Sequence, residues 1–176
     1  MKLKLQYKSG PMDNCQTPPY ALDPILPYLD KSLTWWEPAM GKGNIVNTLV
    51  DKGYKIHGTD IEKGWDYFYC ELPTLWDVSI TNPPYGLKFK WLARCYELGK
   101  PFALLVPVEM LGAKQTQELL KVNPFEIMLL NRRVNFEMPN KGYNGAGAQF
   151  PVFWLTSRIL PEKVMFGEIN QKKPVI

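Results

Sequence analysis

The amino-acid sequence predicts an α/β fold in which a mostly parallel sheet carries helices on both faces. Segments with strand patterns alternate with segments of helical spacing from residue 33 to roughly 130, as expected for parallel strands joined by helical crossovers. Residues 101–108 are almost continuously apolar, which is typical of a strand that is covered on both faces. Gly53 and Gly99 follow two of the helical segments and predict where these helices end.

The expected helices and strands can be given in chain order. A first helical segment at 21–29 contains Pro24 and Pro27, which predict a short or kinked helix. The expected strands are 33–37, 54–61, 77–81, 101–108, 126–131 and 152–156, and the further helices are 44–52, 89–98 and 113–122.

The other segments are expected to be irregular and to lie within one domain, residues 1–176. Residues 1–19 are predicted to be an N-terminal loop or arm, and residues 62–76 an irregular, aromatic stretch. A long loop is expected at 132–150. Residues 158–176 are predicted to form a short C-terminal segment or an extra edge element.

Composition excludes several classes of site. The cysteines Cys15, Cys70 and Cys95 form no CxxC pair, and His57 is the only histidine. A disulfide framework, a metal site and a Ser-His triad are therefore not expected, and His57 is interpreted as a structural strand residue. The net charge of +4 permits a polyanionic partner without requiring one. Without a signal peptide or a long apolar run, a cytoplasmic protein with no membrane partner is expected.

A glycine-containing loop lies between the first predicted strand and the helix that follows it. The loop reads Glu37-Pro38-Ala39-Met40-Gly41-Lys42-Gly43. Glycines let the backbone approach a ligand closely, and the helix N-terminus offers free N–H groups. The next strand ends at Asp60, close to the roughly 20-residue separation expected for an acid that binds a ribose. Together these features predict a nucleotide-like ligand at the carboxyl ends of the strands.

The more specific motif is Asn82-Pro83-Pro84-Tyr85, which follows the compact strand 77–81. Two prolines force an extended, rigid backbone, which can aim the Asn82 amide and the Pro83 carbonyl at one point. An amino nitrogen conjugated to a ring is a poor nucleophile, and two acceptors for its hydrogens would increase its lone-pair character. Tyr85 is expected to stack on a flat base.

These motifs resemble the amino-methyltransferase family of Rossmann-like enzymes, which includes the DNA adenine-N6 methyltransferases. Asn82-Pro83-Pro84-Tyr85 matches the catalytic tetrapeptide of that family, and residues 37–43 resemble its cofactor loop. The order of Thr17-Pro18, then Glu37-Pro38, then the tetrapeptide resembles the gamma arrangement. The resemblance covers residues 15–157. It implies S-adenosylmethionine as cofactor and a three-layer sandwich that ends in an antiparallel hairpin.

The resemblance also assigns roles to individual residues. Asp60 matches the ribose-binding acid, Asp66 the acid that accepts from the adenine amino group of the cofactor, and Tyr67 or Phe68 would flank that adenine. The implied cofactor-binding residues are Thr17, Pro18, Glu37, Pro38, Ala39, Gly41, Gly43, Asp60, Ile61, Asp66, Tyr67, Phe68 and Asn82. The implied substrate-binding residues are Tyr85, Arg132, Arg133 and Phe136, whose aromatic ring packs against a flipped base in the family.

The sequence departs from the family in one respect. Members that read a DNA sequence carry a separate target-recognition domain, and only about twenty residues follow the last predicted strand. The loop 132–150 is the sizeable candidate for substrate contacts. Relaxed specificity, a structured RNA, a partner subunit or homodimer, or a non-nucleic target would each account for this departure.

The predicted reaction is direct, in-line methyl transfer to the N6 amino group of adenine, with DNA favoured over RNA. No Pro-Cys motif is present, which argues against the thiolate chemistry of cytosine-C5 methylation. Methylation of a protein glutamine amide, cytosine-N4 methylation and a catalytically idle S-adenosylmethionine-binding subunit remain as alternatives. The basic charge and the segment from Arg132 to Phe136 favour a nucleic acid.

Overall fold

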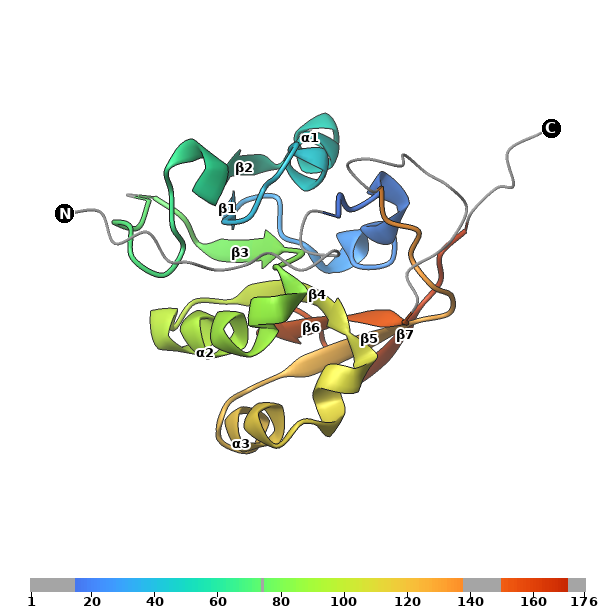
Figure 1. Cartoon of the computed structure of the whole chain (residues 1–176). Coiled ribbons are helices and arrows are strands. Elements are labelled where there is room, and N and C mark those ends of the chain that lie inside the picture. Colours follow the sequence, from blue (N-terminus) through green and yellow to red (C-terminus); the bar gives the residue numbers. More distant parts are fainter. Residues whose placement is uncertain (1–14, 74, 138–149, 171–176) are drawn as a thin grey trace.

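The computed structural model describes residues 15–73, 75–137 and 150–170, which form a seven-stranded sheet between two layers of helices (Figure 1). The strands are β1 (Thr34–Glu37), β2 (Lys55–Gly58), β3 (Val78–Thr81), β4 (Phe102–Pro107), β5 (Glu126–Leu130), β6 (Val152–Ser157) and β7 (Val164–Gly167). The helices are α1 (Asn44–Asp51), α2 (Lys88–Leu98) and α3 (Lys114–Val122). Short 3-10 helices are η1 (Pro19–Ala21), η2 (Leu26–Tyr28), η3 (Ile61–Lys63), η4 (Tyr85–Leu87) and η5 (Val108–Gly112).

The sheet has the order β2-β1-β3-β4-β6-β5-β7. Strands β2, β1, β3 and β4 are parallel to one another, and β6 is inserted antiparallel between β4 and β5. The predicted fold class is therefore confirmed, as is the antiparallel C-terminal part. Strand β7 pairs in parallel with β5 at the edge, so the segment after residue 158 supplies an extra edge strand.

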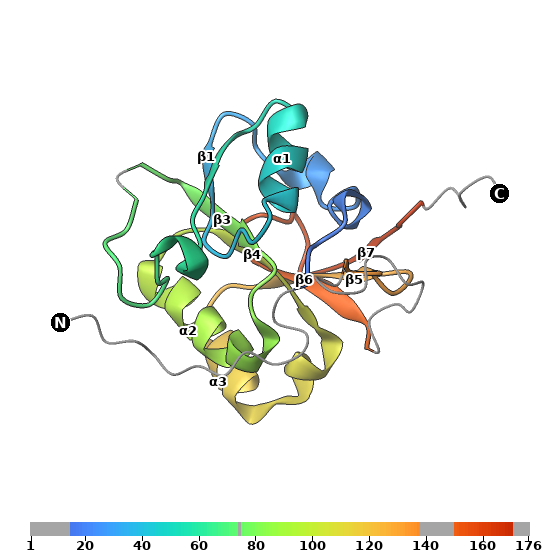
Figure 2. The same cartoon turned by 45° about the horizontal axis from the view of Figure 1, so that its top comes forward.

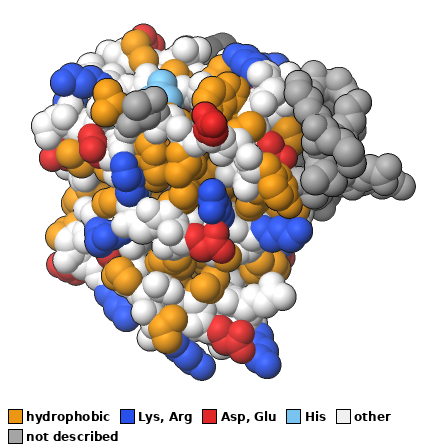
Figure 3. All heavy atoms as spheres, turned by 90° about the vertical axis from the view of Figure 1, so that its left-hand side faces the viewer, with side chains coloured by type: hydrophobic (Ala, Val, Ile, Leu, Met, Phe, Trp, Pro, Cys, Tyr) orange, Lys and Arg blue, Asp and Glu red, His pale blue; other side chains and the backbone are white. Residues whose placement is uncertain are grey.

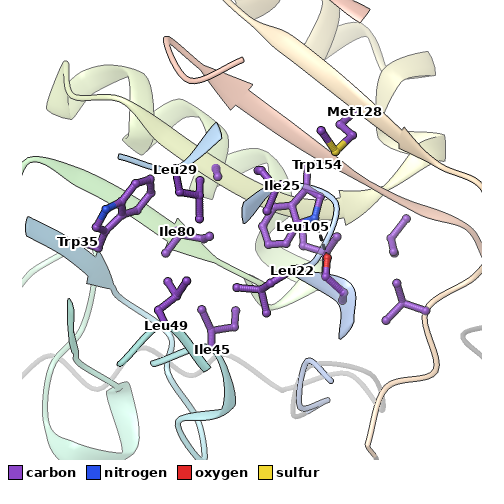
Figure 4. Close-up of a cluster of buried hydrophobic side chains, with 14 of the residues drawn as sticks. Leu22, Ile25, Leu29, Trp35, Ile45, Leu49, Ile80, Leu105, Met128 and Trp154 are labelled. Atoms are coloured by element: carbon purple, nitrogen blue, oxygen red, sulfur yellow. Dashed lines mark hydrogen bonds between the residues drawn. The ribbon is translucent and has the colours of Figure 1, made fainter. Parts of the chain in front are cut away.

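The two faces of the sheet are covered by different helices, as two views show (Figures 1 and 2). Helix α1 with η1 and η2 covers one face, and α2 with α3 covers the other. Successive strand residues point to opposite faces, so Trp35 of β1 packs on the first side and Trp36 on the second. The first cluster includes Trp154, whose indole N–H donates to the Ala21 carbonyl over 3.0 Å (Figure 4). This bond fixes η1 against the sheet.

Two helices end close to the glycines that were expected to terminate them. Helix α2 ends at Gly99, which has φ of +68°, and Gly53 with φ of +83° follows the end of α1. The helix expected at 21–29 is wrong as a continuous element, because the chain forms the separate 3-10 helices η1 and η2 there. Pro24 and Pro27 lack the N–H groups that a continuous helix needs. His57 lies on β2, and partial burial lowers its pKa, in agreement with a structural role.

Three of the irregular segments can be compared with expectation only in part. Residues 1–14, most of the loop 132–150 and residues 171–176 lie outside the described residues. The described part of that loop, 132–137, is held by an isolated antiparallel bridge between Gln16 and Glu137. Within the described ranges, no helix is long and apolar enough to cross a membrane, and no group of His, Cys, Asp or Glu could hold a metal ion.

Candidate cofactor and target site

A cavity of about 290 Å³ lies where β1, β2 and β3 end. Parallel strands bring their carboxyl ends to one edge of the sheet, so residues distant in sequence meet there. The lining includes these predicted cofactor residues: Thr17, Glu37, Pro38, Ala39, Gly41, Asp60, Ile61, Asp66, Tyr67 and Asn82. It also includes Pro84 of the tetrapeptide.

The glycine-containing loop turns tightly over the end of β1. Gly41 and Gly43 have φ of +52° and +88°, in the region that favours glycine. The Met40 N–H donates to the Thr59 carbonyl over 3.0 Å, and the Gly43 N–H donates to Met40 over 2.7 Å. These bonds attach the loop to the end of β2 and start α1 at the cavity wall.

Asp60 holds two backbone segments together. One carboxylate oxygen accepts from the Gly41 N–H over 2.8 Å, and the other accepts from the Glu62 N–H over 2.9 Å. Each carboxylate oxygen has a second lone-pair site, so the group retains capacity to accept from a ligand. Asp60 therefore shapes the loop and faces the cavity at the same time.

Glu37 at the end of β1 is a buried carboxyl with incomplete hydrogen bonding. It is 2% exposed, and its Oε2 has no partner among the described residues. Burial raises its pKa well above the ordinary value, a backbone hydrogen bond from Val46 opposes this, and the nearby Asp60 charge adds to it. A buried acceptor without a donor is costly, so a donor or a positive group from a ligand would stabilise it.

Asn82 begins the tetrapeptide at the end of β3. Its side-chain Oδ1 is buried and finds no partner in the described part of the chain, although Asn82 lines the cavity. Pro83 is buried and Pro84 lines the cavity, so the diproline holds Asn82 in a packed, extended backbone. The motif thus holds an unused amide acceptor on a residue that lines the same cavity as Glu37 and Asp60.

Tyr85 lies in an aromatic cluster next to the cavity rather than in its lining. The ring is 7% exposed and meets Phe136 edge-to-face at 6.3 Å and Phe150 at 5.5 Å between centroids. Burial raises the pKa of the Tyr85 hydroxyl, and the neighbouring Cys15 raises it further. The structure brings together Tyr85 and Phe136, two of the residues expected to contact substrate. Arg132 and Arg133 are exposed just after β5 and do not line the cavity.

The two aromatic residues expected to flank an adenine are placed differently from one another. Tyr67 lines the cavity but stacks on Trp91 at 4.0 Å and 7°, with its hydroxyl 3.3 Å from the Cys95 sulfur. Phe68 does not line the cavity and packs edge-to-face on Trp91. The Asp66 carboxylate, which lines the cavity, accepts from the Phe68 N–H over 2.9 Å. Pro18, Gly43 and Pro83 do not line the cavity either.

Sequence reasoning missed several residues of the cavity wall. Trp65 is 40% exposed and lines the cavity together with Ile61, which is 62% exposed. The aromatic density of residues 62–76 was visible in the sequence, but it did not distinguish Trp65 from its neighbours. The other lining residues that were missed are Cys15, Gln16, Met40, Lys42, Asn44, Ile45, Glu62 and Trp91.

One face of the molecule, the left-hand side in Figure 1, is mixed in charge. Figure 3 shows a face on which lysine and arginine side chains are interspersed with acidic ones, with hydrophobic side chains between them. This face therefore does not offer a uniformly positive surface to a polyanion.

Comparisons with known proteins relate the chain to others through its fold. No protein-family model matches it, and no curated protein matches it in sequence. Among solved structures, a predicted O-methyltransferase from Agrobacterium tumefaciens has a TM-score of 0.48 and 13% identity, over 82% of this chain and 83% of that one. The type IIG restriction endonuclease BpuSI has a TM-score of 0.53 and 18% identity, over 83% of this chain. The chain spans 25% of the length of BpuSI, and the likeness is one of fold.

Proposed function

We propose that this protein is an S-adenosylmethionine-dependent N-methyltransferase that methylates the N6 amino group of adenine in nucleic acid, with DNA favoured over RNA. One observation carries the proposal: Asn82, within an Asn-Pro-Pro-Tyr motif, lines a cavity at the strand ends, and its buried amide oxygen has no partner among the described residues. An acceptor with no internal partner is suited to a donor that arrives with substrate.

The cavity wall fits S-adenosylmethionine chemically. The unpaired Oε2 of Glu37 would accept from the positively charged amino group of the methionine part. Asp60 has the acceptor capacity that two ribose hydroxyls require. Ile61 and Trp65 offer exposed apolar surface beside Asp66 for the flat adenine. When bound, the cofactor supplies an electrophilic methyl group on a sulfonium.

The residues of the tetrapeptide would prepare the amino group for attack. Asn82 Oδ1 and the Pro83 carbonyl would each accept one of its hydrogens, which shifts electron density toward the nitrogen lone pair. The packed diproline keeps these acceptors from relaxing toward water, so the stabilisation is preorganised. No general base is needed, because the methylated nitrogen loses its extra proton readily. Tyr85 and Phe136 would form the aromatic wall against which the base lies.

Two features support a nucleic acid as the substrate. Arg132 and Arg133 are exposed directly before the stretch that carries Phe136, so cations stand beside the proposed base wall. The likeness in fold to a restriction endonuclease favours DNA within this class. A partner subunit or a second copy of the chain would supply target recognition, since the described residues include no second domain.

The test is transfer of a tritiated methyl group from S-adenosylmethionine to unmethylated DNA, bulk RNA and protein extract, each offered separately to the purified chain. The labelled material is digested and the product is identified by chromatography against standards. Label in N6-methyladenine from DNA is the expected result. Label in glutamine would replace the proposal with protein methylation, and label in N4-methylcytosine would change the target base.

Cofactor affinity, measured by calorimetry on the same preparation, separates the remaining outcomes. Binding of S-adenosylmethionine without transfer to any fraction would contradict an autonomous methyltransferase and would favour a binding subunit. Absence of cofactor binding would overturn the proposal as a whole.

A further inference from the structure

We infer that Gln16, Lys42 and Glu137 form a clasp that transmits cofactor binding to the target-base wall, with Gln16 and Glu137 as positioning residues. This inference rests on the proposed function, since it presumes a cofactor in the cavity and a base at Tyr85. It adds a coupling between the two sites, which the motifs do not specify.

The clasp joins three segments that are distant in the chain. The backbones of Gln16 and Glu137 pair in both directions, with hydrogen bonds of 2.9 and 3.0 Å. The Gln16 side-chain oxygen accepts from the Lys42 N–H over 2.9 Å. The Lys42 ammonium in turn lies 3.2 Å from the Glu137 carboxylate. Each member of the clasp therefore contacts both of the others.

One end of the clasp belongs to the cofactor cavity. Gln16 and Lys42 line it, and Lys42 follows Gly41, whose N–H is held by Asp60. The loop also fits tightly against Gln16, because a Cβ on Gly41 would lie 2.6 Å from the Gln16 side-chain nitrogen. A ligand that contacts this loop and Asp60 would thus restrict the position of Gln16.

The other end of the clasp belongs to the target side. Glu137 does not line the cavity, but it follows Phe136, which is buried against Tyr85. Asn135 is held as well, since its N–H donates to the Tyr20 hydroxyl over 2.8 Å. Restriction of Gln16 would therefore restrict the strand-like stretch that places Phe136. Ligands that order a shared element assist one another, and the effect is reciprocal.

Amide hydrogen exchange with and without sinefungin, an unreactive analogue of the cofactor, tests this inference without any nucleic acid. In the wild-type protein, sinefungin should slow exchange at residues 60–62 and, through the clasp, at residues 134–137 by about fivefold, the lower end of common coupling strengths. Glu137→Gln and Lys42→Met should each retain the protection at 60–62 and lose most of it at 134–137. Glu118→Gln, which breaks the exposed Lys114–Glu118 pair on α3, should behave as the wild type.

The two substitutions alter net charge in opposite directions, so a common loss of protection cannot come from charge alone. Protection at 60–62 without protection at 134–137 in the wild type would overturn the clasp and leave the proposed function standing. Equal protection at 134–137 in the wild type and both variants would overturn it too. Absence of protection at both places would show that the analogue does not bind, and the proposed function would fail together with the clasp.

Discussion

The proposed cofactor side and the proposed target side of this site differ in how ready they are to receive a ligand. On the cofactor side, the Glu37 and Asp60 carboxylates border a cavity that already exists, and their backbone supports are in place. On the target side, the Tyr85 ring is closed in by Phe136 and Phe150, with little exposed face. The cavity proposed for the cofactor is therefore preformed, whereas the proposed stacking of a base on Tyr85 requires these neighbours to rearrange.

The largest expected effect is at Asn82, which stands between the two sides. Asn82→Ala removes the acceptor for the amino group, and methyl transfer should fall by about a thousandfold, the upper end of the range for loss of one preorganised hydrogen bond. Cofactor affinity in calorimetry should change little, because the cofactor side retains its carboxylates. The control is Asn123→Ala at the end of α3, where the side-chain amide donates to the Leu119 carbonyl over 2.9 Å. Near-normal transfer by Asn82→Ala would contradict the proposed role.

A substitution at Asp60 should impair the proposed cofactor side, whereas Asn82→Ala should impair methyl transfer and leave cofactor affinity nearly unchanged. Asp60→Ala removes the proposed ribose acceptor and also the partner of the Gly41 and Glu62 N–H groups. Cofactor affinity should fall by about a hundredfold, in line with the roughly 3 kcal/mol that charged hydrogen bonds contribute. Asp23→Ala, at an exposed position, is the matched control. Unchanged affinity in calorimetry would reject the ribose role of Asp60.

A pair of glycines tests whether the shape of the cofactor loop matters beyond its backbone freedom. Gly41 and Gly53 both have positive φ, but only a side chain on Gly41 would collide with Gln16. Gly53→Ala should therefore lower stability by about 1 kcal/mol and leave cofactor affinity unchanged. Gly41→Ala carries the same backbone strain and should also weaken cofactor binding by about tenfold. Equal affinities of the two variants would indicate that the loop tolerates displacement.

The same comparison explains how much of the molecule was predictable. The order of strands and helices follows from local patterns, and so does the meeting of Glu37, Asp60 and Asn82, because parallel strand ends share an edge. The placement of Trp65 and Phe68 did not follow. Which side chain of an irregular aromatic stretch faces a cavity depends on how the stretch folds back on α2, where Tyr67 stacks on Trp91.

The target side shows the same limit over longer distances. Phe136 and Tyr85 were each expected to contact a substrate base, and the structure brings the two rings together. The bridge from Gln16 to Glu137 has no counterpart in local sequence, because it depends on the path of two loops around the cavity. The break between η1 and η2 was partly predictable, since Pro24 and Pro27 forbid a regular helix but do not specify two separate turns.

The smallest expected effect concerns the pH dependence of stability in the cofactor-free protein. Burial raises the pKa of Glu37 above its ordinary value of 4.5, so the folded state binds this proton more tightly than the unfolded state. The resulting stabilisation is complete below pH 4.5 and is lost as pH rises through the folded-state pKa. Gln at this position cannot ionise. The melting temperature of the wild type minus that of Glu37→Gln should therefore decrease progressively as pH increases. The melting temperature of the wild type minus that of Glu118→Gln should stay nearly constant, because both proteins retain Glu37.

Binding of the proposed cofactor should reduce the pH dependence of stability that arises from Glu37. A positive amino group beside Glu37 would favour the carboxylate, lower its pKa and reduce the pH dependence. Sinefungin carries such an amino group, so melting curves with saturating sinefungin should show a smaller relative fall for the wild type. A fall of the same size with and without the analogue would place its amino group away from Glu37. In that case the cavity would still be preformed, but the methionine part of the cofactor would have to be held by other residues, with Thr17 and Asn44 of the same wall as the next candidates.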